Sequence, residues 1–305
     1  MIILLINILI LFFAPFLMLG VIKKTKAFFA GRKGVSIWQP YRDIMKLFKK
    51  EYVVSETTSW VFGFAPIVIF ATTLFAALFA PLSCRVPVFQ LPAAFIIFAY
   101  TLSLGKFFSL LAAMDTGSSF EGMGAAREAC FSTIVEPAFF IAMASIVALT
   151  TDVSFAGFLN ILAKSGVYGY IIILLLALTL FVMMLIECCR VPVDDPTTHL
   201  ELTMIHEVMV LDNSGFDLAL INWASAIKML LFESLIATLL IPIGLDIWQM
   251  VLAYIAVITI LSVIVGIVES SMARFRMTHV FEFIFVMTIT ALIILALVTY
   301  RIYGS

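Results

Sequence analysis

The chain has 305 residues, of which 64% are hydrophobic and only 12% are charged. Its mean hydropathy is +1.18 and its net charge is -1. This composition excludes a soluble globular protein, and no basic tract interleaved with aromatic residues indicates nucleic-acid binding. The apolar runs are long enough to cross a bilayer, which takes roughly 20 residues. We therefore predict a polytopic integral membrane protein.

The apolar runs predict about eight transmembrane α-helices, because only helices satisfy their backbone hydrogen bonds internally over such lengths. The first run begins at Met1 without a basic segment or a cleavage site, which indicates a retained helix rather than a signal peptide. The expected fold is all-α, in a single membrane domain over 1–305. The predicted helices span about 2–22, 60–82, 91–114, 132–151, 167–187, 223–245, 247–269 and 280–301.

The loops between these helices differ in charge. Those at 23–59, 115–131, 188–222 and 270–279 hold thirteen Lys and Arg residues. The opposite side holds three, Arg85, Lys164 and Arg301. By the positive-inside rule the first set is cytoplasmic. We therefore predict a cytoplasmic-membrane protein with both termini outside.

Residues 40–50 form an amphipathic pattern within the first of these loops. Tyr41, Ile44, Leu47 and Phe48 recur at helical spacing, and the charges lie mostly on the other side. The pattern is typical of an interfacial helix or of one that docks on a partner. A basic anchor on anionic lipid fits equally well, and both interpretations can hold together.

Ionisable residues also lie inside or at the ends of the predicted spans. Such charges snorkel to the interface, pair with a neighbouring helix, or serve transport. Carboxylates and lysines are groups whose pKa shifts far enough on burial to relay protons. As a set they suggest a polar path that enters from the cytoplasm and turns sideways in the membrane. The residues are Lys106, Asp115, Glu136, Glu187, Lys228, Glu233, Glu269 and Glu282.

Two local patterns refine this expectation. Lys228 and Glu233 are five residues apart and do not share a helix face well, so each is expected to meet a partner from another helix. Glu121 and Glu128 flank a run of small residues that contains Gly124. Small residues permit another backbone to approach closely there.

The stretch from Glu187 to Glu207 concentrates charge where a membrane helix reaches water. It contains five acidic residues and two histidines, with prolines that force an extended or turning path, followed by a short helix expected over 197–211. Three interpretations compete: a solvated loop, a metal site, or a polar cavity that feeds protons to the buried carboxylates. The spacing of the candidate ligands matches no zinc signature and no helical histidine pair. These ligands are His199, Glu201, His206 and Glu207.

Redox ligands are scarce in this chain. The four cysteines form no Cys-x-x-Cys unit, and the three histidines fall outside the middle of the apolar runs. Iron–sulfur ligation and a haem held between membrane helices are therefore not expected. We predict no cofactor, no metal and no catalytic residue within this chain.

Several motifs occur together in order along the chain. They are Gln39-Pro-Tyr-Arg-Asp-Ile-Met-Lys46, Leu-x-x-Met-Asp115-Thr-Gly-Ser, Gly124-Ala-Ala-Arg-Glu128, Val-Glu136-Pro137, Glu187-x-x-Arg190-x-Pro192-x-Asp194, Glu201-Leu202, Asp212-Asn-Ser-Gly215 and Glu269-Ser-Ser-Met-Ala-Arg274. This set resembles the family of H-type membrane subunits of respiratory complex I over nearly the whole chain. It is similar in particular to the group 4 membrane-bound nickel–iron hydrogenase branch, which includes hydrogenase-4 component C and formate hydrogenlyase subunit 4.

The resemblance implies a non-redox membrane subunit beneath a hydrophilic arm. That arm would carry iron–sulfur clusters and a nickel–iron site on partner chains, the large and the small subunit, and antiporter-like subunits would lie beside it in the bilayer. The subunit would couple redox chemistry to proton or sodium translocation. Where complex I members carry further glutamates in the central loop, this chain has Thr197 and His199. A histidine changes charge nearer neutrality than a glutamate, so the departure favours the hydrogenase branch over quinone chemistry.

This identification assigns roles to particular residues. The proposed coupling path comprises Lys106, Asp115, Glu136, Glu187, Asp194, Asp195, Glu201, His206, Glu207, Lys228 and Glu233. Docking of the arm, or positioning of loops, falls to Arg42, Lys46, Arg127 and Arg190. Two alternatives remain: a quinone-binding subunit of a complex I-like oxidoreductase, and a passive membrane anchor.

Overall fold

The computed structural model describes residues 2–83, 87–89, 91–155, 157–158, 160–161, 166, 168–195, 204–242 and 244–303. All regular elements in these ranges are helices, and eight of them are long and apolar enough to cross a membrane. The predicted all-α, eight-span fold is confirmed. The helices are α1 (Ile2–Phe29), α2 (Gln39–Leu47), α3 (Trp60–Ala77), α4 (Ala94–Asp115), α5 (Ser119–Thr150), α7 (Tyr168–Glu187), α8 (His206–Met209), α9 (Gly215–Leu240), α10 (Ile247–Ser271) and α11 (Met277–Tyr303).

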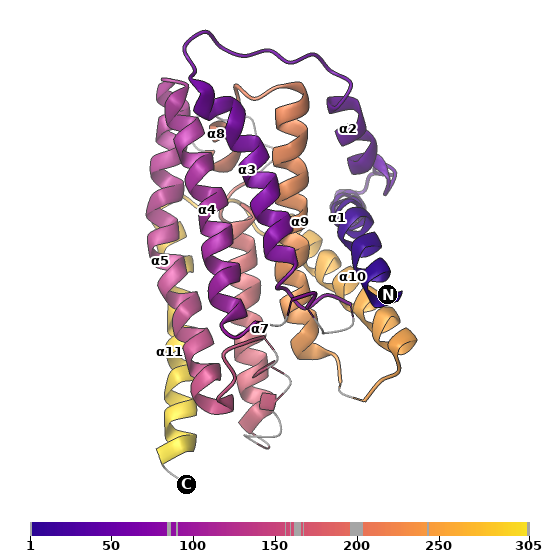
Figure 1. The fold of residues 1–305 in the computed structure, drawn as a ribbon, viewed down its shortest axis with the longest axis vertical. Helices are drawn as coiled ribbons and strands as arrows, with labels where there is room; N and C mark the ends of the chain where they lie inside the picture. The colour runs from indigo at the N-terminus through magenta and orange to yellow at the C-terminus, as the bar shows by residue number, and fades with distance from the viewer. Residues whose placement is uncertain are drawn as a thin grey trace.

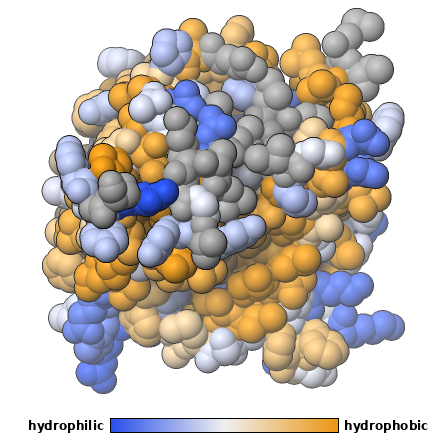
Figure 2. All heavy atoms as spheres, turned by 90° about the horizontal axis from the view of Figure 1, so that it is seen from below, coloured by the Kyte–Doolittle hydropathy of each residue, from blue (hydrophilic) through white to orange (hydrophobic). Residues whose placement is uncertain are grey.

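The helices form a bundle in which α1 and α10 lie tilted against the others (Figure 1). The short helices α2 and α8 lie at one end of the bundle, toward which α1, α4, α7 and α10 run and away from which α3, α5, α9 and α11 run. We call this the loop end. Seen from the opposite end, the surface carries many hydrophobic side chains together with patches of hydrophilic ones (Figure 2). Large apolar side chains are also exposed along the flanks, as a lipid-facing surface requires.

Two helices begin earlier than hydropathy predicted. Helix α5 starts at Ser119 rather than near 132, and α9 starts at Gly215 rather than near 223. The 32 residues of α5 make a helix of about 48 Å, longer than the roughly 30 Å hydrocarbon core. Hydropathy marks only the part of a helix that lipid surrounds, so it does not predict the polar first turns of these two helices.

Other boundaries shift for local reasons. Helix α3 ends at Ala77 rather than near 82, shortly before Pro81, and α1 continues past its lysines to Phe29. The helix expected over 197–211 is wrong where it can be compared, since only His206–Met209 is helical within 204–211.

Helix α9 is the centre of the bundle. In its most apolar stretch 78% of the residues are buried, the largest share among the eight long helices described. It packs against α1, α2, α3, α7 and α10. Any charged side chain on α9 therefore points into protein rather than into lipid, which is where Lys228 and Glu233 originate.

The amphipathic segment 40–50 packs on its own chain. Ile44 of α2 is buried beside Phe16 of α1 and Ala219 of α9. The Phe16 ring also meets that of Tyr41 edge-on, with 5.7 Å between ring centroids. The apolar face of α2 is thus covered within the chain. Its polar face remains exposed at the loop end.

Candidate functional site

The site exists because α7 stops inside the bundle. After Glu187 the backbone of Cys189 takes a left-handed conformation, with φ at 49°. The Arg190 N–H then bonds back to the Leu185 carbonyl at 2.8 Å, which closes the helix end. Pro192 prevents the helix from resuming. The last side chain of α7 is left facing the interior of α4, α5 and α9.

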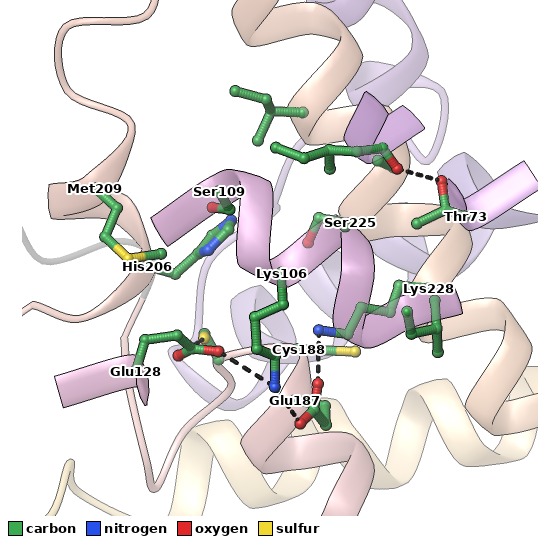
Figure 3. A pocket seen from close by; sticks show the side chains of 16 residues that line it. Thr73, Lys106, Ser109, Glu128, Glu187, Cys188, His206, Met209, Ser225 and Lys228 are labelled. Atoms are coloured by element: carbon green, nitrogen blue, oxygen red, sulfur yellow. Dashed lines mark hydrogen bonds and ion pairs between the residues drawn. The ribbon is translucent and has the colours of Figure 1, made fainter. Parts of the chain in front are cut away.

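Glu187 sits between two lysines from different helices. Its Oε1 lies 2.5 Å from Lys106 Nζ of α4, and its Oε2 lies 2.8 Å from Lys228 Nζ of α9. Lys106 Nζ is also 3.6 Å from Glu128 Oε1 of α5. We call Lys106, Glu128, Glu187 and Lys228 the ion-pair cluster (Figure 3). All four side chains are less than a fifth exposed.

The cluster is electrically balanced when all four groups are charged. Two carboxylates face two ammonium groups, which offsets the cost of removing each charge from water. Ser132 of α5 adds a further acceptor, 2.8 Å from Lys106 Nζ. Lys106 is about three turns from the first residue of its helix and more than two turns from the last, so the balance is made at membrane depth. Removing one member would leave an opposite charge buried without compensation.

Two cavities meet beside this cluster. The first, the cluster cavity, has a volume of about 60 Å³ and is lined by all four cluster residues. The second, the vestibule, has a volume of about 350 Å³ and lies between α1, α2, α9 and the chain after α7. Four residues line both of them: Cys188, Cys189, His206 and Ser225. Figure 3 shows His206 on the α8 side of the cluster cavity.

A smaller cavity extends the cluster away from the vestibule. Lys106 and Glu187 line it together with Glu136 of α5. Ser103 of α4 donates to Glu136 Oε1 at 2.9 Å. Glu136 is therefore adjacent to the cluster without a direct ion pair to it.

A second charged network ties loops together at the loop end. Asp194 is 1% exposed, lies 3.1 Å from Arg274 Nη2, and accepts from the backbone N–H groups of Ile205 and His206. Glu269 of α10 pairs with Lys26 of α1 at 2.9 Å. It also pairs with Arg190 at 3.4 Å. We call the pairs around Asp194 and Glu269 the loop network.

The predicted path residues therefore divide into groups. Lys106, Glu187 and Lys228 come together, and Glu136 lies next to them. Lys228 and Glu233 each meet a partner from another helix, as expected: Glu187 for the first and, at 3.4 Å, Ser262 of α10 for the second.

The remaining path residues lie elsewhere. Asp115 accepts from the backbone and hydroxyl of Ser59, the N-cap of α3, at 2.7 and 2.9 Å. Asp194 belongs to the loop network, and the backbone N–H of Asp195 donates to it. His206 and Glu207 line the vestibule. Glu201 lies outside the described residues, as does His199.

Glu128 is not among the residues predicted for the coupling path, although it is one of the four residues of the ion-pair cluster. The reason is the early start of α5, which turns the assumed loop into helix. Glu121, Glu128, Ser132 and Glu136 recur at intervals of seven, four and four, the spacing of one helix face. This periodicity in the sequence indicates that Glu128 and Glu136 lie on the same face of one helix.

The residues expected to dock an arm also separate. Arg42 and Lys46 are both exposed on α2. Arg127 instead donates to the Met204 carbonyl at 2.9 Å, and Arg190 belongs to the loop network. Gly124 explains how α5 approaches the α8 region so closely, because a Cβ there would lie 2.8 Å from the Ile205 carbonyl oxygen.

The two thiols beside Glu187 are buried just beyond the end of α7. Burial raises the pKa of Cys188 to about 12 and that of Cys189 well above its usual value. They line the junction of the two cavities as neutral groups. Among the residues that the structure describes, no three His, Cys, Asp or Glu side chains are arranged to hold a metal ion.

The fold and the site define a multi-pass helical membrane protein with a balanced ion-pair cluster inside the bundle, joined to a charged vestibule. The family model described as "NADH dehydrogenase" matches residues 1–300. The chain belongs to this family, and the resemblance drawn from its motifs is confirmed.

Two relatives from Escherichia coli (strain K12) are similar to this chain. Hydrogenase-4 component C is 31% identical over 225 residues, which cover 74% of this chain and 70% of the relative. Formate hydrogenlyase subunit 4 is 30% identical over 290 residues, or 90% of each chain.

A solved structure has the same fold. It is that of the membrane-bound sulfane sulfur reductase, an archaeal respiratory membrane complex. One of its chains matches with a TM-score of 0.81 and 20% identity, over 98% of this chain and 100% of that chain. At that identity the likeness concerns the fold.

Proposed function

We propose that this chain is the membrane subunit of a hydrogenase-type, complex I-related assembly, and that its ion-pair cluster couples electron transfer in partner subunits to ion translocation. The names of the two Escherichia coli relatives support the hydrogenase type. In this proposal the loop end is cytoplasmic, as the charge bias predicts. The reaction itself takes place on hydrophilic partner chains that carry the iron–sulfur clusters and the nickel–iron site, with antiporter-like subunits alongside in the membrane.

One observation carries the proposal: Glu187 lies between Lys106 and Lys228, at the meeting point of four helices and two cavities. A buried, balanced set of charges responds strongly when one more charge or proton is added nearby, because each partner is poorly screened. Ionisable residues held at membrane depth in a cavity are the usual components of ion pathways.

The vestibule provides the entrance to this path. It is lined by charged side chains from both ends of the chain, including Lys26, Asp194, Glu207 and Glu269. It shares His206 with the cluster cavity. A change in the arm above the loop end would first alter the electrostatic field at His206 and Glu207. It would then alter the field at Glu187. Arg42 and Lys46 of α2 offer a basic surface for that arm.

The experiment is to purify the complex through a tag on this chain and to identify the chains that accompany it by mass spectrometry. The proposal expects a nickel-binding large subunit, an iron–sulfur small subunit and antiporter-like chains. Reconstituted vesicles supplied with reduced methyl viologen are expected to form a transmembrane ion gradient that an uncoupler abolishes.

Two outcomes would replace the proposal. Turnover that is insensitive to uncouplers and forms no potential would make the chain a passive anchor. Tightly bound quinone, together with loss of turnover under quinone-site inhibitors, would assign it to a quinone-reducing complex.

A further inference from the structure

The interface of α9 and α10 contains a polar ladder on the far side of the ion-pair cluster from the loop end. Its members are Glu233, Ser234 and Thr238 on α9, and Tyr254 and Ser262 on α10, all of them at most 5% exposed. They interrupt a contact that is otherwise apolar, formed by residues such as Leu230, Ala237 and Ile258. Buried hydroxyl and carboxyl groups in such a setting cost free energy unless each has a partner.

The partners are found across the interface. Ser262 Oγ lies 3.4 and 3.5 Å from the two oxygens of Glu233. One residue further along α9, Ser234 Oγ lies 2.6 Å from the hydroxyl oxygen of Tyr254. Ser234 also donates to the Leu230 carbonyl at 2.7 Å, so in this arrangement Tyr254 is the donor to Ser234. Thr238 then donates to the Ser234 carbonyl at 2.8 Å.

The ladder continues the direction of the path. Glu233 lies five residues beyond Lys228 on α9, about 7.5 Å further from the loop end. Thr238 lies about 7.5 Å further again, which leaves a few Å of helix before Leu240 ends α9. On α10, Tyr254 lies eight residues, or about 12 Å, from Asp246, which is the N-cap of that helix. The polar side chains thus extend from the cluster toward the opposite face.

Interhelical packing alone accounts poorly for this arrangement. Hydrogen bonds between membrane helices contribute on average about 0.6 kcal/mol, and a phenylalanine would fill the space of Tyr254 without a hydroxyl to satisfy. Nor does packing require an acidic residue beside the Ser234–Tyr254 pair. Hydroxyl groups are both donors and acceptors, so they can pass a proton between neighbouring polar groups, here two hydrogen-bonded pairs that start from adjacent residues of α9.

We propose that the α9–α10 interface carries the outward half of a proton path in this chain, with Glu233 as the acceptor from the cluster and Ser234 and Tyr254 as relay groups. The inference rests on the proposed function, in which the cluster is the inward half. In the arrangement seen, Tyr254 donates to Ser234, so both O–H bonds first rotate until Ser234 donates to Tyr254 and the Tyr254 proton points toward the opposite face. A proton that then reaches the Ser234 oxygen displaces the proton of that hydroxyl to Tyr254, whose own proton leaves toward the opposite face. Rotation of the two O–H bonds then restores the starting state, with no net change in either residue. The proposal requires water to bridge the span between Tyr254 and the aqueous phase.

The test uses the whole complex in vesicles, driven by reduced methyl viologen. Acidification is followed with a pH-sensitive dye, and electron transfer is followed with and without an uncoupler. Tyr254→Phe is expected to lower the protons moved per electron roughly tenfold while uncoupled turnover stays near that of the parent complex. The matched control is Tyr300→Phe on α11, whose side chain is 68% exposed. It is expected to change neither quantity.

A second pair of variants separates relay from packing. Ser234→Thr keeps a hydroxyl and is expected to retain pumping, whereas Ser234→Ala is expected to lose it. Full pumping in Tyr254→Phe and Ser234→Ala, or equal loss of pumping and uncoupled turnover, would overturn the relay. Sodium uptake in place of acidification would also overturn it, because a sodium ion cannot pass along hydroxyl groups. If Glu187→Gln also pumped fully, the proposed function itself would be wrong.

Discussion

The ion-pair cluster and the loop network are both buried sets of charges, yet they are built differently. In the cluster, carboxylates meet only side chains: Glu187 contacts Lys106 and Lys228, each from another helix and each facing a cavity. In the loop network, Asp194 is held by Arg274 and by three backbone N–H groups. Side chains beside a cavity can rearrange, whereas backbone donors are held by the fold. In the proposed function, buried charge therefore serves coupling in one region and architecture in the other.

The largest expected effect on stability concerns the loop network. Asp194→Asn removes the negative charge that faces Arg274 and three backbone N–H groups, at a cost of about 3–5 kcal/mol. Because the loop after α7 then loses its anchor, the yield of assembled complex, turnover and pumping are expected to fall together. Thermal unfolding of the purified complex measures the loss. Normal stability with a selective loss of pumping would place Asp194 in the path instead.

A smaller effect is expected where α5 meets the α8 region. Gly124→Ala forces a Cβ toward the Ile205 carbonyl and Val208, which should cost about 1–3 kcal/mol. Gly122→Ala is the matched control, because no atom lies within 4 Å of the Cβ it would add. The two variants are compared by thermal unfolding. Equal stability would mean that the close approach at Gly124 is not required.

The smallest effect is a difference in thiol labelling. Cys130 is exposed, whereas Cys188 and Cys189 are buried between the two cavities. Because burial raises the pKa of Cys188 to about 12, the reactive thiolate stays scarce through neutral pH and increases only as pH rises toward that value. N-ethylmaleimide at neutral pH is expected to modify Cys130 first and the buried pair only after denaturation, as read by mass spectrometry. Early labelling of Cys188 would indicate that the vestibule opens further than the structure shows.

Hydropathy and charge predicted the eight helices, because each span must bury its backbone in lipid. They did not predict the first three turns of α5 or the first two of α9, which are polar and lie among other protein elements. Glu128 was missed with them. The acidic residues of α5 recur at helical spacing in the sequence. They can be recognised as one helix face only when the helix is known to begin at Ser119.

The residue types predicted which groups at membrane depth are ionisable. They did not predict which of these side chains contact one another. Asp115 and Glu187 both end a helix and both follow an apolar run. Asp115 accepts hydrogen bonds from Ser59 at the start of α3, whereas Glu187 faces inward because α7 ends inside the bundle. That difference depends on the packing of four helices, which no local pattern encodes.

The contrast between these two carboxylates supplies the most direct test of the coupling role of the cluster. Glu187→Gln and Asp115→Asn each neutralise one carboxylate at the end of a membrane helix, and both are compared in vesicles by the protons moved per electron transferred. We expect a drop of roughly a hundredfold for Glu187→Gln, with uncoupled electron transfer retained, and a ratio near that of the parent complex for Asp115→Asn. Undiminished pumping in Glu187→Gln would contradict the coupling role.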